Sequence, residues 1–204
     1  MPEMYHDGNR QLQDKFDTRR MANLMAERVV GDSMSEDDKA FIQSRDMFFL
    51  ATSDDEGRPN CSYKGGDPGF VRVIDEHTIA FPNYDGNGMY LSMGNVLQHG
   101  HVGILFIDFE QQSRMRLNGV ASIDEHDPLM AECPGAQFIV RVRANEVFGN
   151  CPRYIHKYQL VERSKYVPRE ACQTPDPEWK KGLAEHAPDL LPERDRERLA
   201  PGDR

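Results

Sequence analysis

The sequence predicts a mainly β fold of the α+β class: a small closed barrel with helices before it and an extended tail after it. Between residues 47 and 148, segments of strand length follow one another and are separated by turns rich in Gly, Asp and Asn. Only one segment among them, residues 89–98, has helical spacing. The connections are too short for repeated βαβ crossovers, so a barrel is favoured over a parallel sheet.

Residues 1–45 are expected to form a helical extension. Apolar side chains in residues 9–30 recur near a 3.6-residue period, which predicts one helix that ends at Gly31. A second helix is expected to start at Ser35, whose hydroxyl can cap free amides. Asp38 lies three residues further on, where a carboxylate stabilises a helix N-terminus.

Residues 46–164 are expected to hold the six or seven strands of the barrel. The strand segments are 47–52, 58–64, 70–74, 78–81, 101–109, 114–123 and 137–148, and residues 82–88 are a predicted loop before the helix. The last two strand segments alternate apolar and polar residues, which is typical of strands with one buried face. Residues 165–204 contain many prolines and charges, which predicts an extended tail with at most short helices.

The composition excludes some functions. A net charge of -9 and a pI near 5.3 argue against nucleic acid as a partner, because duplex-binding proteins carry a basic face. No segment approaches the roughly 18 apolar residues of a membrane span, and the N-terminus lacks an apolar signal core, so we expect a cytoplasmic protein without membrane contact. The four cysteines form no CxxC pair and are expected to be free thiols.

Two segments could bind an anion. Residues 82–88 lead from a strand into a helix, where free amides and glycines can approach a phosphate, although an ordinary strand–turn–helix connection has the same composition. Ser62 and Lys64 are two residues apart and therefore point to one face of a strand. A hydroxyl and an ammonium there suit a phosphate or a flavin carbonyl; the alternative is an exposed lysine before a Gly-rich hairpin.

Other charged residues give weaker signals. Arg114, Arg116 and Asn118 share one face of a strand, where they could contact a ligand or simply be solvated. Arg72 lies among apolar neighbours and needs a carboxylate or a ligand as a partner, because an unpaired buried charge is costly. His99 and His101 are expected to cap a helix–strand junction, and no metal site is predicted.

The order of these segments is more specific than any one of them. SYKGG at 62–66, GFVRV at 69–73, YDGNGMYLSMGN at 84–95 and RLNG at 116–119 follow one another as in a known family. Over about residues 5–150 the chain resembles the flavin mononucleotide (FMN)-binding family related to pyridoxamine 5'-phosphate oxidase. It is most similar to the bacterial flavin-nucleotide-binding branch.

The resemblance implies a six-stranded split β-barrel and a homodimer in which both subunits contribute to an FMN groove. Arg72, Lys64 or backbone amides would have to hold the phosphate, because many relatives have two basic residues where this chain has Gly88 and Met89. The implied cofactor-binding residues are Ser62, Tyr63, Lys64, Gly65, Arg72, Pro82, Asn83, Asn87, Gly88, Met89, Arg114, Arg116 and Asn118.

The expected function is that of an FMN-dependent oxidoreductase with a small-molecule substrate of unknown identity. Vitamin B6 oxidation is not expected, because residues 124–137 leave little room for the helix that holds the substrate phosphate in true oxidases. No catalytic residue is predicted, since the flavin supplies the redox chemistry. The alternatives are a non-catalytic flavin carrier or sensor, or a relative that binds deazaflavin or haem, with His99, His101 or His156 as the axial ligand.

Overall fold

A computed structural model describes residues 4–170 and 172–200, so parts of the predicted extension and tail lie outside the described residues. The chain divides into two compact units, Met1–Val161 and Glu162–Arg204. The first unit contains the barrel and the helices that precede it. The division into 1–45, 46–164 and 165–204 remains a prediction.

The helices before the barrel are α1 (Asp7–Lys15), α2 (Arg19–Arg28) and α3 (Glu36–Gln43). The prediction of a single helix over residues 9–30 is wrong, because Asp17 takes a left-handed φ of 51° and separates α1 from α2. The start of α3 is as predicted. The Ser35 hydroxyl accepts a hydrogen bond from the Asp38 amide at 3.2 Å, and the Asp38 carboxylate accepts one from the Ser35 amide at 2.9 Å.

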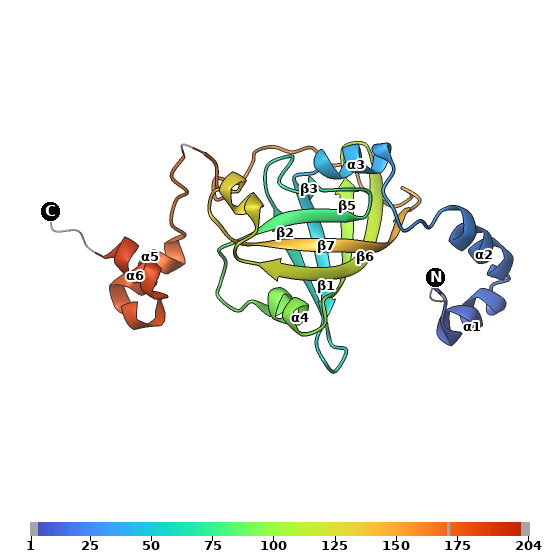
Figure 1. Ribbon diagram of the computed structural model, residues 1–204, viewed down its shortest axis with the longest axis horizontal. Helices are drawn as coiled ribbons and strands as arrows, with labels where there is room; N and C mark the ends of the chain where they lie inside the picture. Colours follow the sequence, from blue (N-terminus) through green and yellow to red (C-terminus); the bar gives the residue numbers. More distant parts are fainter. Residues whose placement is uncertain (1–3, 171, 201–204) are drawn as a thin grey trace. The chain divides into compact units, whose positions relative to one another are not determined.

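Seven strands form one antiparallel sheet with the order β2-β1-β5-β6-β7-β4-β3. The strands are β1 (Met47–Ser53), β2 (Pro59–Gly65), β3 (Arg72–Val73), β4 (Thr78–Tyr84), β5 (His101–Asp108), β6 (Ser113–Asp124) and β7 (Ala136–Gly149). The sheet curls into a split barrel, with α4 (Leu91–His99) inserted between β4 and β5 (Figure 1). The predicted fold class is thus confirmed.

Aromatic side chains fill the interior of the barrel and show how the sheet closes. Phe48 of β1 meets Phe81 of β4 edge-to-face, with ring centroids 4.9 Å apart, and lies 5.4 Å from Phe106 of β5. All three are buried. Because β1 and β4 are not neighbours in the sheet, the contact between Phe48 and Phe81 crosses the interior.

The strand β4 is longer than expected. Residues 82–84 were predicted to start the loop, but they continue the strand, with Pro82 opposite Ile139 of β7. On the other side, β3 reaches only Ala80, so the later part of β4 forms an edge. An edge tolerates a proline, because no second neighbour requires its missing amide hydrogen. The loop proper is therefore shorter and begins after Tyr84.

The second unit contains short helices, as predicted for the tail: α5 (Glu178–His186), η2 (Pro188–Leu190) and α6 (Glu193–Leu199). Its centre is a buried ion pair in which Lys180 Nζ lies 2.6 Å from Asp195 Oδ2. Nothing in the local sequence predicted this pair. Among the described residues of the chain, no helix has the length and apolar character required to cross a membrane.

Candidate functional site

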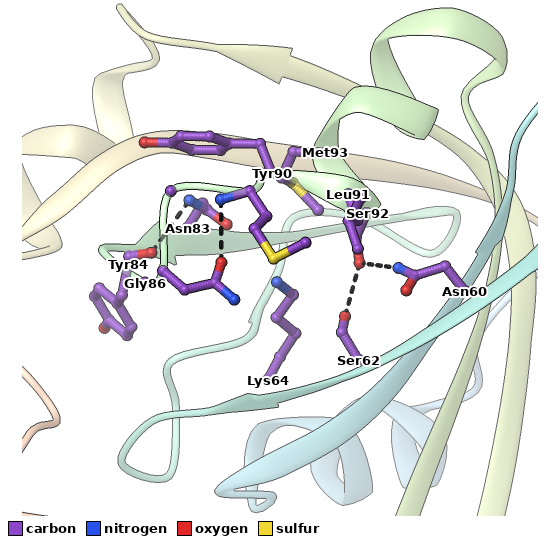
Figure 2. Close-up of a pocket in the computed structure, with 13 residues that line it drawn as sticks. Asn60, Ser62, Lys64, Asn83, Tyr84, Gly86, Tyr90, Leu91, Ser92 and Met93 are labelled. Atoms are coloured by element: carbon purple, nitrogen blue, oxygen red, sulfur yellow. Dashed lines mark hydrogen bonds between the residues drawn. The ribbon is translucent and has the colours of Figure 1, made fainter. Parts of the chain in front are cut away.

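A polar pocket lies where the two ends of the sheet approach each other. It is formed by β2, by the end of β4, by the loop after β4 and by the first turn of α4 (Figure 2). The strands β2 and β4 are far apart in the sheet order, so the pocket follows the split of the barrel. Its lining residues are Asn60, Ser62, Lys64, Asn83, Tyr84, Gly86, Asn87, Gly88, Met89, Tyr90, Leu91, Ser92 and Met93.

Lys64 provides the positive charge of the pocket. Its side chain extends from β2 toward the loop that leads into α4 (Figure 2). Among the described residues, the Lys64 ammonium has no hydrogen-bond or ion-pair partner. Burial lowers the pKa of Lys64, because the charged form loses part of its hydration. An anion in the pocket would restore the lost stabilisation of that charge.

The N-terminus of α4 faces the same pocket. Tyr90 precedes the helix in a left-handed conformation with a φ of 49°, and no side chain caps the first turn. The first turn also lacks an acidic residue. The first amides of a helix have no partner within it, so those of Leu91, Ser92 and Met93 can donate to an anion. Gly88, with a φ of 77°, allows the backbone turn before the helix.

A chain of hydrogen bonds joins β2 to α4 at the edge of the pocket. Asn60 Nδ2 donates to Ser92 Oγ at 2.8 Å, and Ser92 Oγ donates to Ser62 Oγ at 2.9 Å (Figure 2). Ser92 is buried, whereas Asn60 and Ser62 are both half-buried and line the pocket.

On the side of the pocket formed by β4 and the start of α4, the side-chain amide of Gln137 from β7 holds two lining residues in place. Gln137 Oε1 accepts hydrogen bonds from Asn83 Nδ2 at 3.0 Å and from the Tyr90 hydroxyl at 3.1 Å. Tyr84 is half-buried, and burial, with smaller contributions from Cys133 and Asp67, raises its pKa to about 12. The Tyr84 phenol is therefore protonated at neutral pH.

The structure brings part of the predicted site together. Six of the predicted residues line the pocket: Ser62, Lys64, Asn83, Asn87, Gly88 and Met89. Tyr63 lies on the opposite face of β2, 62% exposed, with its ring edge-to-face against Phe49. Gly65 and Pro82 are in β2 and β4 but do not line the pocket, and neither does Arg72, whose Nη2 lies 4.0 Å from Glu132 Oε2.

The three predicted residues of β6 lie elsewhere. Arg114, Arg116 and Asn118 do not line the pocket. Arg116 lies over the Phe148 ring at 5.9 Å, and Asn118 Nδ2 donates to Glu146 Oε2 at 2.8 Å. They alternate with the buried Met115 and Leu117, which places them on the outer face of the barrel.

That outer face has an apolar row which crosses five strands. The register aligns Tyr63 of β2, Phe49 of β1, Leu105 of β5, Arg116 of β6 and Phe148 of β7. Four of these side chains are apolar or aromatic, and all five are exposed or half-buried. We call these five residues the outer row.

Seven lining residues were not among the predicted cofactor-binding residues: Asn60, Tyr84, Gly86, Tyr90, Leu91, Ser92 and Met93. Of these, Tyr84 and Gly86 belong to residues 82–88, which were predicted as a possible anion-binding segment. The alternation of β2 could have identified Asn60, since it shares a face with Ser62 and Lys64. No local pattern indicated that Ser92 lines the pocket, because this depends on where α4 crosses β2.

No histidine lines the pocket. His99 Nε2 lies 2.5 Å from Asp55 Oδ1, His101 is exposed at the start of β5, and the His156 ring is 6.4 Å from the Tyr158 ring. The residues suggested as axial haem ligands are therefore outside this pocket.

Comparison with known proteins gives a family match. The family model described as pyridoxamine 5'-phosphate oxidase matches residues 34–164. A search of the curated proteins found no match.

Solved structures with a similar arrangement are distant in sequence. The haem storage protein HutZ from Vibrio cholerae is 22% identical, with a TM-score of 0.41, and the match covers 56% of this chain and 93% of that one. An FAD-binding protein from Mycobacterium smegmatis is 16% identical, with a TM-score of 0.42 and coverages of 59% and 97%. An FMN-binding protein from Syntrophomonas wolfei is 11% identical, with a TM-score of 0.43 and coverages of 69% and 96%.

Proposed function

Since this chain belongs to the pyridoxamine 5'-phosphate oxidase family, we propose that it binds FMN in the pocket between β2, β4 and α4 and acts as an oxidoreductase. The observation that carries the proposal is the position of Lys64. Its ammonium, which lacks a partner among the described residues, shares the pocket with the uncapped N-terminus of α4. Together they form a site for a dianionic phosphate.

The residues of the pocket fit the phosphate end of FMN. Lys64, the Ser62 hydroxyl and the first amides of α4 are hydrogen-bond donors, and a phosphate oxygen is an acceptor. The resemblance implies two basic residues where this chain has Gly88 and Met89, and we propose that these donors take their place. Met89 and Tyr90 add an apolar rim that suits the edge of a flavin ring. The bound flavin would supply the hydride or electron chemistry.

We also propose that the site is completed by a second copy of the chain. The cavity of one chain encloses about 190 Å³, which is below the roughly 300–1,000 Å³ of typical ligand pockets. Arg116 belongs to the outer row, and Arg114 and Asn118 lie on the same outer face beside it, away from the pocket of their own chain. In a homodimer that buries the outer row, these side chains could reach the flavin of the partner.

The absorption spectrum of the purified protein tests the proposal. Flavin bands are expected, and a nicotinamide donor should bleach them, with recovery in air. Flavin bands that no donor bleaches would indicate a carrier or a sensor. A Soret band would indicate haem and would contradict the proposed pocket, because no histidine lines it. A protein that neither carries a flavin nor takes up added FMN would overturn the proposal. The cytoplasmic location expected from the sequence remains a prediction.

A further inference from the structure

We propose that Asn60 and Ser92 are positioning residues that act through Ser62 to prepare the pocket for a phosphate monoester. This inference rests on the proposed function, because it concerns the phosphate end of the FMN site. Neither residue was a candidate from sequence patterns, and both lie at the junction of β2 with α4.

The hydrogen bonds from Asn60 to Ser92 and from Ser92 to Ser62 orient the Ser62 hydroxyl. Asn60 Nδ2 donates to Ser92 Oγ, and Ser92 uses its single hydroxyl hydrogen to donate to Ser62 Oγ. Because the Asn60 amide nitrogen can only donate, the Ser92 hydrogen is free for Ser62. With Ser92 as the donor, the hydroxyl hydrogen of Ser62 is left to donate into the pocket. Hydrogen bonds in a chain polarise one another, which makes the last hydroxyl a better donor.

The same hydrogen bonds also hold the N-terminus of α4 beside β2. The strand β2 and the helix α4 share no backbone ladder, so side chains must hold the helix N-terminus beside Lys64. The buried Ser92 lies in the first turn of α4 and joins it to β2. The Ser62 hydroxyl, the Lys64 ammonium and the α4 amides then present donors to one volume (Figure 2). A phosphate, which offers only acceptors when fully ionised, matches this lining.

A matched control exists on the same helix. Asn95 Nδ2 donates to Thr52 Oγ1 at 3.0 Å, which joins α4 to β1 without lining the pocket. Asn95→Ala therefore removes an anchor of α4 of similar geometry but leaves the chain from Asn60 to Ser62 intact. This variant therefore distinguishes a general loss of α4 anchoring from the loss of the Ser62 hydroxyl as an oriented donor.

The test is a double-mutant cycle on the full-length protein, with FMN affinity measured by titration for the wild type, Asn60→Ala, Ser62→Ala and the double variant. Ser62→Ala should weaken FMN binding by about 10-fold or more, because it removes a hydrogen bond to a charged group. Asn60→Ala should weaken it by roughly 3-fold to 10-fold. The double variant should be no weaker than Ser62→Ala, since Asn60 acts through Ser62.

Two further readouts separate the outcomes. Asn95→Ala should lower the Tm as much as Asn60→Ala does, but leave FMN affinity unchanged. Riboflavin, which lacks the phosphate, should bind Asn60→Ala and the wild type equally. Additive losses in the double variant, or an equal loss of FMN affinity in Asn95→Ala, would overturn the inference while the proposed function stands. A wild type that does not bind FMN would overturn both.

Discussion

The pocket and the outer face of the barrel differ in nearly every property, although they alternate along the same strands. On β2, the residues Ser62 and Lys64 point into a polar pocket, whereas Tyr63 between them belongs to the outer row. The pocket combines hydrogen-bond donors with an apolar rim, whereas the outer row offers apolar area with one arginine. Under the proposed function, one chain supplies the phosphate end of a flavin site, and we propose that the outer row of a second copy completes it.

The largest effect is expected from a charge placed in the outer row. Leu105→Asp should convert the proposed dimer into a monomer and weaken FMN binding by about 100-fold or more, because a buried unpaired carboxylate in an interface costs several kcal/mol. Light scattering gives the mass and titration gives the affinity. Leu97→Asp is the control, since Leu97 is 76% exposed on α4 and outside the pocket. If the Leu105→Asp protein is still a dimer that binds FMN, the outer row is not the interface.

The next effect is expected from the charge of the pocket. Lys64→Ala should weaken FMN binding by about 10-fold to 100-fold and leave the dimer intact, because it removes one charged hydrogen-bond donor. Lys39→Ala is the control, since Lys39 pairs with Glu36 at 2.7 Å on α3 and is not part of the pocket. An unchanged affinity in Lys64→Ala would remove Lys64 from the site.

A smaller effect is expected from alkaline pH. A bound phosphate dianion favours the charged form of Lys64, so FMN binding raises its pKa and takes up a proton at high pH. Affinity should therefore fall as pH rises, and the fall should begin below the ordinary lysine value of 10.5, since burial lowers the pKa of free Lys64.

The pH profile can be assigned to Lys64 by a conservative variant. Lys64→Arg keeps its charge in this range, so its affinity for FMN should stay constant between about pH 7 and about pH 10. Titrations at several pH values compare it with the wild type. If both proteins lose affinity in parallel, a group other than Lys64 causes the fall.

Local patterns were enough to predict most of the fold. The alternation in β6 and β7 and the capping residues Ser35 and Asp38 act over a few neighbours, and the structure agrees with them. The break at Asp17 was not predictable in this way, since the apolar period continues across it. The extension of β4 through Pro82 was not predictable either, because it depends on how far β3 pairs along β4.

Lining residues were predicted only where the alternation of a strand, or the glycines of a turn, determine which residues face the pocket. Alternation on β2 placed Ser62 and Lys64 together, and the glycines of the loop indicated the start of α4. The same alternation on β6 correctly grouped Arg114, Arg116 and Asn118, but it could not tell which side of the barrel they face relative to the pocket. The role of Ser92 was not predictable from local patterns. Its partners Asn60 and Ser62 are about 30 residues away in sequence and contact it only after folding.

The most direct test of the phosphate site compares FMN with riboflavin. The two ligands share the ring and differ in the phosphate, so the ratio of their Kd values for the wild-type protein reports on the donors around Lys64. We expect FMN to bind at least about 100-fold more tightly, which corresponds to roughly 3 kcal/mol from charge-assisted hydrogen bonds. Equal affinity for the two ligands would contradict the assignment of the pocket between β2, β4 and α4 as a flavin phosphate site.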